Sequence, residues 1–352
     1  MKYTNVFYFK KINSIGGCES WFYYLSKLYK NMIIYYREGN SEQIKRFAKN
    51  VEVHKYKEGE IINCDNFFCC YGPDIINNVN AKMYAHVIHC DYKQVWFSPI
   101  LNPKFNKYIA VSKLAGESFK ELTGIDYELI YNPVAIDQLK VEKYNDGKLH
   151  LISATRLTKE KGKERMQKLA KMLEDAGIDY IWEVYTNKTR EIIGKNVIYK
   201  EPKINIIPEI AKADYLVQLS DCEAFCYSII ESLMVGTPVI VTDLPVLKEL
   251  GVRHGFEGYI CNFDMNNINI LEIAKKSLKP AYKPPKSNWN KYLDNNSTYN
   301  PDELVKVRCR RGIYLIEEDY HTHKSEIIEL KRYRASELEC KDYVEILWNY
   351  RL

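Results

Sequence analysis

Short apolar runs alternate with longer amphipathic stretches over most of the 352 residues. The expected strands are NVFYF, MIIYY, NFFCCY, MYAHVIH, KYIAVS and YELIYN, followed after residue 147 by LHLISATR, DYIWEVYT, KNVIYK, DYLVQLS and TPVIVTD. The expected helices cover residues 17–30, 113–123, 163–176, 206–213 and 227–235. Because parallel strands need crossover helices and are covered on both faces, this alternation predicts an α/β protein with parallel sheets.

The apolar strands recur on both sides of a polar, turn-rich segment, NPVAIDQLKVEKYNDGK. The sequence therefore predicts two doubly wound domains, residues 1–135 and 148–280. Residues 281–299 are rich in proline and asparagine, and we expect a connector with one short helix at 289–293. Short alternating strands return in residues 300–352 and predict a small β-rich module.

The composition is that of a globular protein, with 46% hydrophobic and 28% charged residues. No run approaches the ~18 apolar residues of a membrane-spanning helix, and the first thirty residues lack the apolar core of a signal peptide. Ten cysteines are scattered without the spacing of a zinc site; the closest pairs are Cys69 with Cys70 and Cys222 with Cys226. We therefore expect reduced thiols and a cytoplasmic location.

The formal net charge of +5 is too small to indicate a nucleic-acid partner. Residues 1–135 hold 17 Lys and Arg against 13 Asp and Glu, so +4 of this charge lies in the first third. Such a basic surface suits an anionic membrane or an acidic substrate. A lysine-rich face in contact with water explains it equally well.

Two short segments follow expected strands and carry groups that suit an anion. Gly16 and Gly17 open a helix after the first strand, where a bare backbone approaches a ligand closely and free amides face it. Arg156 and Lys161 follow the first strand of the second domain, where two cations suit a diphosphate leaving group. The plainer interpretations are an ordinary glycine loop and a solvated basic loop.

Glu223 and Glu231 lie eight residues apart in SDCEAFCYSIIESLMVGTPVIVTD. At 3.6 residues per turn, Glu231 falls within about 80° of the face that Glu223 occupies. Two such acceptors suit neighbouring hydroxyls, those of a sugar and a ribose. In the alternative, Glu223 is favoured by the helix dipole and Glu231 is a surface residue. The apolar residues around Glu231 argue against that, because a carboxylate in such surroundings usually has a partner.

The segment EAFCYSIIESLMVGTPVIVTD resembles the E-x7-E signature of retaining glycosyltransferases of family four (glycosyl transferases group 1). This resemblance extends over residues 1–295 and includes the early glycine pair, YIAVSKLAGESFKELTGIDYELIYNPVAID, ATRLTKEKG and GFEGYICNFD in order. SNWNKYL is similar to the closing helix of that family, which crosses back onto the first domain. The resemblance implies the GT-B fold, two Rossmann-like domains facing a cleft, with the β-rich tail added.

Residue by residue, the resemblance implies a binding site for a nucleotide-sugar. Arg156 and Lys161 would hold the donor diphosphate in place of a metal, so no metal or other cofactor is expected. Glu223 would contact the hydroxyls of the donor sugar and Glu231 those of the ribose. The amides expected to help are those of Phe225, Cys226, Tyr227 and Ser228.

From the first domain, the resemblance implies that Gly16 and Gly17 approach the donor phosphate and the acceptor. His89, in HVIHCD, would face the transferred sugar. His86 lies three residues earlier and is the alternative, and a histidine at a strand end is otherwise a core residue.

The sequence departs from the family at two glycines. The family commonly has E-G-F-G where this chain has Ala224 and Cys226. Cys226 adds bulk beside the expected phosphate contact, which restricts the donor or weakens the enzyme. The usual Asn-Gly of the linker is Asn132 followed by Pro133, a change expected to affect hinge stiffness.

These features predict a retaining, metal-independent glycosyltransferase with a UDP-sugar as the first choice of donor. The expected acceptor is a cell-envelope glycan or lipid-linked saccharide, reached from the cytoplasm or from the inner face of the membrane. Two alternatives stay open: a glycosyltransferase that modifies nucleic acid or protein through the extra module, and a non-catalytic GT-B protein that binds nucleotide-sugars.

Overall fold

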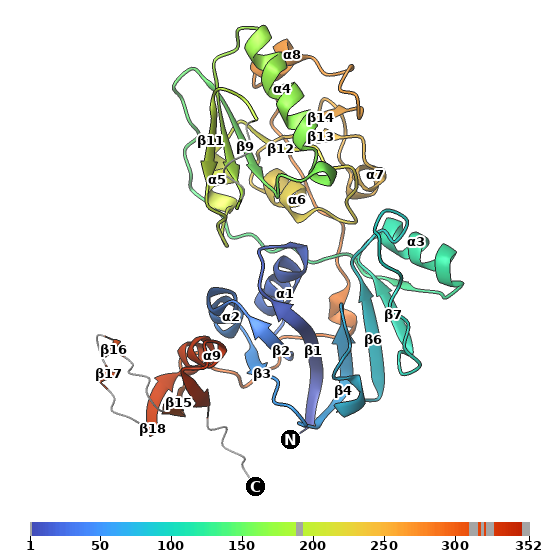
Figure 1. Cartoon of the computed structure of the whole chain (residues 1–352), viewed down its shortest axis with the longest axis vertical. Coiled ribbons are helices and arrows are strands. Elements are labelled where there is room, and N and C mark those ends of the chain that lie inside the picture. Colours follow the sequence, from blue (N-terminus) through green and yellow to red (C-terminus); the bar gives the residue numbers. More distant parts are fainter. Residues whose placement is uncertain (1, 188–192, 310–315, 318–319, 322–326, 347–352) are drawn as a thin grey trace.

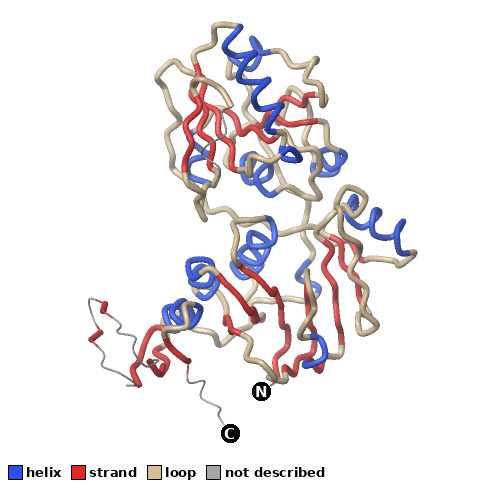
Figure 2. The backbone as a smooth tube through the Cα atoms, in the orientation of Figure 1, coloured by secondary structure: helices blue, strands red, loops and turns tan. Residues whose placement is uncertain are grey.

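The computed structural model describes residues 2–187, 193–309, 316–317, 320–321 and 327–346. Figure 1 shows two lobes stacked along the longest axis, with the C-terminal segment beside the N-terminal lobe. Each lobe is built on its own parallel sheet (Figure 2).

The first domain contains an eight-stranded sheet. Its strands are β1 (Lys2–Ile12), β2 (Ile33–Gly39), β3 (Glu52–Lys55), β4 (Ile62–Cys69), β5 (Val79–Asn80), β6 (Met83–Ile88), β7 (Lys107–Ala110) and β8 (Glu128–Leu129). The order is β3-β2-β1-β4-β6-β7-β8, with β5 beside β4, and every pairing is parallel. The helices are α1 (Gly17–Leu28), α2 (Ser41–Ala48), α3 (Lys113–Thr123) and the short η1 (Ile76–Asn78).

Strand β1 is apolar on both faces, as expected for the centre of a covered parallel sheet. Phe7 points to one face, where it packs against Trp21 and Phe22 of α1. Val6 and Tyr8 belong to the core on the opposite face. All five side chains are fully buried, so this strand anchors the sheet from both sides.

The second domain contains a six-stranded parallel sheet of order β11-β10-β9-β12-β13-β14. These strands are β9 (Leu149–Ala154), β10 (Tyr180–Tyr185), β11 (Val197–Lys200), β12 (Tyr215–Gln218), β13 (Val239–Thr242) and β14 (Gly258–Cys261). Its helices are η2 (Lys159–Lys161), α4 (Lys163–Asp175), α5 (Ile207–Lys212), α6 (Tyr227–Met234), α7 (Pro245–Leu250) and α8 (Ile270–Ala274).

The predicted fold class, two doubly wound domains with a small C-terminal β-rich module, is confirmed.

The connector brings the chain back to the first domain through η3 (Trp289–Lys291). The fully buried ring of Trp289 lies 5.5 Å from that of Trp21 and 6.0 Å from that of Phe7, between ring centroids. Just beyond, the Lys30 amide donates a 2.9 Å hydrogen bond to the Asp294 carbonyl. A buried tryptophan therefore ties the end of the second domain to the first.

The C-terminal module forms an antiparallel sheet in which β15 (Leu304–Cys309) lies between β18 (Ile327–Lys331) and β19 (Val344–Ile346). A separate ribbon pairs β16 (Ile316–Glu317) with β17 (Tyr320–His321). Helix α9 (Arg332–Cys340), which the sequence pattern did not predict, packs on α2 of the first domain (Figure 1). An ion pair of 3.0 Å between Lys45 and Glu337 joins the two helices, and one of 2.7 Å between Lys55 of β3 and Asp342 adds a second contact between the module and the first domain.

Within the part of the chain that the structure describes, no helix has the length and apolar character that crossing a bilayer requires.

Candidate active site

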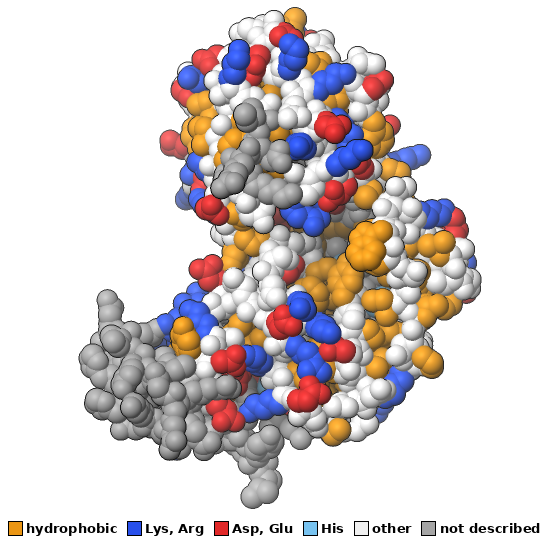
Figure 3. Space-filling model, viewed as in Figure 1, with side chains coloured by type: hydrophobic (Ala, Val, Ile, Leu, Met, Phe, Trp, Pro, Cys, Tyr) orange, Lys and Arg blue, Asp and Glu red, His pale blue; other side chains and the backbone are white. Residues whose placement is uncertain are grey.

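Loops of the two domains face each other at the junction between the two sheets (Figure 1). Figure 3 shows the surface hollowed between the upper and lower lobes. A cavity of about 500 Å³ is lined by residues 13–15, 40, 42 and 43 of the first domain and by residues 202–205 of the second. Ligands of doubly wound sheets bind at the carboxyl ends of the strands, so a ligand site is expected at this junction.

Gly16 and Gly17 lie between β1 and α1, next to the residues of the first domain that line this cavity. Gly16 is the residue before α1, and a side chain there would come within 2.9 Å of the Glu19 carboxylate. That carboxylate accepts hydrogen bonds from the Ser14 hydroxyl at 2.7 Å and from the Ser14 amide at 3.2 Å, and burial raises the pKa of Glu19. A side chain at Gly17 would face the Tyr227 ring of the second domain at 4.0 Å.

The Lys161 ammonium lies 2.7 Å from Glu223 Oε1. Lys161 ends η2 after β9, and Glu223 stands in the loop between β12 and α6. The same carboxylate oxygen accepts hydrogen bonds from the Ser220 hydroxyl at 2.8 Å and the Gln218 amide at 3.2 Å. Burial alone would lower the pKa of Lys161, but the Glu223 carboxylate outweighs it and raises that pKa, so the ammonium stays charged.

Gly162 positions this lysine, a role that the sequence reasoning missed. Its φ of +78° is a conformation that suits glycine, and a Cβ there would lie 1.8 Å from the Leu219 carbonyl oxygen. Only a residue without a side chain lets the turn after Lys161 lie against the end of β12. The glycine flanked by charged residues in KEKGKER was the signal that could have revealed it.

Arg156 lies in the same loop but remains open to solvent. Its side chain is 69% exposed, and its guanidinium reaches the Glu160 carboxylate only at 4.0 Å. An exposed pair at this distance contributes little to stability. The Arg156 side chain therefore keeps the freedom to turn toward an incoming anion.

Glu231 is buried in α6, with 8% of its surface exposed. It accepts a 2.7 Å hydrogen bond from the Tyr24 hydroxyl of α1, and the Tyr24 ring stacks on Tyr227 with 5.5 Å between centroids. Burial raises the pKa of Glu231 to about 7, although Tyr24 and the Arg46 guanidinium both act to lower it. The expectation of a partner is confirmed, and the alternative interpretation as a surface residue is wrong.

The loop before α6 contains Ala224 and Cys226, the two residues that replace glycines of the family pattern. Cys226 has a φ of +60°, a left-handed conformation, while Ala224 is not among the residues with positive φ. The Cys226 thiol lies 3.3 Å from the Ser228 hydroxyl, and burial raises its pKa to about 12. The backbone at position 226 therefore has the shape that favours glycine, although the residue is cysteine.

His89, and not His86, lies among the loops at the carboxyl edge of the first sheet. His86 is fully buried within β6, its Nδ1 lies 3.2 Å from the Cys69 carbonyl oxygen, and burial lowers its pKa to about 4. His89 follows β6 and packs edge-on against Trp21 with 4.8 Å between ring centroids. Its ring nitrogen lies near the thiols of Cys18 and Cys70.

Residues 136–280 match the family model for glycosyl transferases group 1. This segment includes Arg156, Lys161, Glu223 and Glu231, the four charged residues that the sequence assigned to donor binding. This part of the chain belongs to the glycosyl transferases group 1. None of the curated proteins compared with the chain matches it.

Solved structures of glycosyltransferases share the two-domain architecture. Anabaena Alr3699/HepE, in complex with UDP and glucose, is similar with a TM-score of 0.62 at 15% identity over 78% of this chain and 89% of that chain. A glycosyltransferase from Rickettsia africae reaches 0.54 at 15% identity, over 78% and 91% of the two chains. The lipopolysaccharide outer core galactosyltransferase WaaB reaches 0.50 at 16% identity, over 78% and 89%. At such identities the likeness shows the fold, which is GT-B.

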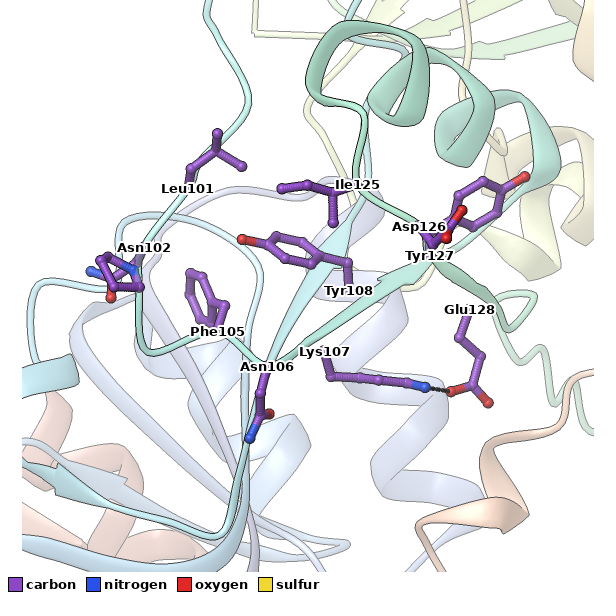
Figure 4. Close-up of a pocket in the computed structure, with 11 residues that line it drawn as sticks. Leu101, Asn102, Phe105, Asn106, Lys107, Tyr108, Ile125, Asp126, Tyr127 and Glu128 are labelled. Atoms are coloured by element: carbon purple, nitrogen blue, oxygen red, sulfur yellow. Dashed lines mark ion pairs between the residues drawn. The ribbon is translucent and has the colours of Figure 1, made fainter.

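A larger cavity, of about 690 Å³, lies away from this site (Figure 4). The start of β7, the loop before it and the segment 125–128 line it, and Lys107 forms a 2.6 Å ion pair with Glu128 there. None of the residues that the sequence assigned to the donor lines this cavity. The larger cavity is therefore separate from the residues that the sequence assigned to donor binding.

Proposed function

We propose that this glycosyltransferase transfers a sugar from a UDP-sugar to a hydroxyl group of a glycan or lipid-linked saccharide, with retention of the anomeric configuration. The observation that carries this proposal is the partly buried Lys161–Glu223 pair at the entrance of α6, within the segment that matches the family. One pair brings together a cation for the leaving diphosphate and a carboxylate for the transferred sugar.

Lys161 and Arg156 are proposed to stabilise the diphosphate as it leaves. Negative charge builds on the diphosphate while the sugar–oxygen bond breaks, so cations already in place help the transition state more than the bound donor. Lys161 is held in place by Glu223, and Arg156 is exposed beside it. Two side-chain cations supply what a divalent metal supplies elsewhere, and we propose that transfer needs no added Mg²⁺ or Mn²⁺.

Glu223 is proposed to orient the donor sugar. Its Oε1 already accepts hydrogen bonds from Lys161, Ser220 and Gln218. A carboxylate oxygen engaged in this way is a weak nucleophile, and its surroundings suit an acceptor for sugar hydroxyls better than a group that attacks carbon. The amides of residues 225–228, at the start of α6, are proposed to face the phosphates.

Glu231 is proposed to accept hydrogen bonds from the ribose hydroxyls. The Tyr24 hydroxyl now donates to that carboxylate at 2.7 Å. A ribose that takes both oxygens of Glu231 would displace Tyr24, so donor binding would exchange a contact between the domains for one with the ligand. This exchange links nucleotide binding to the packing of α1 on α6.

The choice of donor and acceptor class draws on the structural neighbours. Anabaena Alr3699/HepE was solved with UDP and with UDP-glucose, and WaaB is named as a lipopolysaccharide outer core galactosyltransferase. We propose a UDP-sugar as donor and a cell-envelope saccharide as acceptor by that likeness. The basic first domain suits an acceptor on an anionic membrane surface, with 17 Lys and Arg against 13 Asp and Glu in residues 1–135.

A panel of nucleotide-sugars tests the proposal by thermal unfolding of the full chain. A bound donor at about 100 times its Kd should stabilise the protein by about 2.7 kcal/mol. The Lys161→Ala variant should lose part of this stabilisation, whereas Lys159→Ala, an exposed lysine in the same turn, should keep it. Stabilisation without donor hydrolysis or transfer would leave a non-catalytic binding protein, and no stabilisation by any nucleotide-sugar would refute the donor site.

A further inference from the structure

Three segments of the first domain bring two thiols and an imidazole together. Cys18 is the second residue of α1, Cys70 directly follows β4, and His89 directly follows β6. Strands β1, β4 and β6 are neighbours in the sheet, so the loops at their carboxyl ends lie side by side. This position is close to Gly16 and Gly17, at the junction of the two domains.

The three side chains present one ligand atom each within a small volume. The two Sγ atoms and one ring nitrogen of His89 all lie within 4.8 Å of one another. In a tetrahedral zinc site, with Zn–S of about 2.3 Å and Zn–N of about 2.0–2.1 Å, neighbouring ligand atoms lie about 3.5–3.8 Å apart. The ligand atoms of the cluster are therefore farther apart than those around a bound ion by about 1.3 Å at most.

The surroundings of the cluster suit metal binding. His89 Nε2 is a buried polar atom without a hydrogen-bond partner among the residues that the structure describes. Cys70 is only 2% exposed, while Cys18 and His89 are partly exposed, so the cluster has a closed inner side and an open outer side. Thiolate and imidazole select zinc-like cations, whereas Mg²⁺ and Ca²⁺ prefer oxygen ligands.

We propose that Cys18, Cys70 and His89 bind one Zn²⁺-class cation, with a water or a substrate oxygen in the fourth position. Three protein ligands and one open position are the pattern of metal sites that contact a substrate, while closed structural sites use four. In this arrangement His89 acts through the cation and does not itself touch the transferred sugar. The site is separate from the donor residues of the second domain, so the proposed function does not depend on it.

Metal titration of the full chain, kept reduced with a phosphine, tests the site. We expect one Zn²⁺ per chain by elemental analysis and, with Co²⁺ in its place, the absorption bands of thiolate-bound cobalt. Cys18→Ser and His89→Ala should each weaken Co²⁺ binding by at least about 10-fold, since removing a ligand costs more than removing a group that supports one. Cys340→Ser, which changes a partly exposed thiol of α9, should leave binding unchanged.

Three results would overturn the proposal. The first is a metal content far below one ion per chain after exposure to excess Zn²⁺. The second is Co²⁺ binding by Cys18→Ser that equals the wild type. The third is a Cys18–Cys70 disulfide in freshly prepared protein, found by mass spectrometry. Because Cys18 is partly exposed, its variant should fold, and unchanged UDP binding by Cys18→Ser would show that it has folded while leaving the donor site intact.

Discussion

The Tyr24 hydroxyl donates a 2.7 Å hydrogen bond to the Glu231 carboxylate and so joins α1 of the first domain to α6 of the second. The two residues are 207 positions apart. Glu231 is nearly completely buried, and this bond gives its carboxylate a hydrogen-bond partner of the kind that a buried polar group requires. Tyr24 thus stabilises the group that we propose for binding the ribose.

The buried position of Glu231 predicts a pH-dependent stability. Its pKa is raised to about 7 in the folded chain, above an ordinary glutamate, so its contribution is complete below about pH 4.5 and is lost as the pH rises through 7. The free energy of unfolding should fall by up to about 3 kcal/mol over that range because of this group. Glu231→Gln should abolish this part of the change, as measured by urea unfolding at pH 5 and pH 7.5.

Glu164→Gln, an exposed position on α4, is the matched control for that measurement. It should follow the wild-type curve at both pH values. Parallel curves for the wild type and Glu231→Gln would show that Glu231 does not titrate in this range.

The two glutamates should separate nucleotide binding from sugar binding. Glu231→Ala should weaken binding of free UDP and of the intact donor alike, by about 1.5–3 kcal/mol for hydrogen bonds to a charged group. Glu223→Ala should keep its affinity for free UDP and lose sugar transfer. Tyr24→Phe removes the same hydrogen bond as Glu231→Ala but frees the carboxylate, so its affinity for UDP should not decrease. Isothermal titration calorimetry with UDP separates Glu231→Ala from the other two variants, and a transfer assay identifies Glu223→Ala. Equal UDP affinity for wild type and Glu231→Ala would contradict the ribose role.

The two cations should matter more for catalysis than for binding. Lys161→Ala and Arg156→Ala should each lower kcat by about 10²–10³, the usual effect of removing one preorganised charged group, with smaller changes in KM. Lys159→Ala should have wild-type kinetics. Steady-state rates with and without added Mg²⁺ or Mn²⁺ should agree. A strict requirement for either ion, or an inverted anomeric product by NMR, would reject the mechanism.

The left-handed backbone of Cys226 predicts an unusual effect of glycine. Cys226→Gly should be about 1 kcal/mol more stable than Cys226→Ala, because only residues with a Cβ are strained at a φ of +60°. Ala224 lies two residues away and does not have a positive φ. Ala224→Gly should therefore lower the free energy of unfolding by about 0.4–1 kcal/mol, because glycine gives the unfolded chain more freedom. Urea unfolding measures all three variants, and equal stability of the two Cys226 variants would show that the conformation carries no strain.

Local signals explain which helices could be predicted. Residues 113–123 were predicted as a helix and form α3, where the Ser112 hydroxyl accepts a hydrogen bond from the Ala115 amide and Gly124 ends the helix with a φ of +72°. Helix α2 was missed although Asn40 caps it and Ile44, Phe47 and Ala48 have helical spacing, because a helix of eight residues shows that spacing over a single turn only. Helix α9 was missed because its polar residues pack on another helix, and nothing in its own pattern indicates that partner.

The sequence by itself determined the fold class, the order of the segments that carry Gly16, Lys161, Glu223 and Glu231, and the need of Glu231 for a partner, since periodicity and polarity are local properties. The tertiary structure decided which residues contact one another. Tyr24 reaches Glu231 only because α1 packs on α6, and Cys18, Cys70 and His89 meet only because β1, β4 and β6 lie side by side. Such contacts depend on the order of strands in a sheet, which the spacing of residues along the chain does not contain.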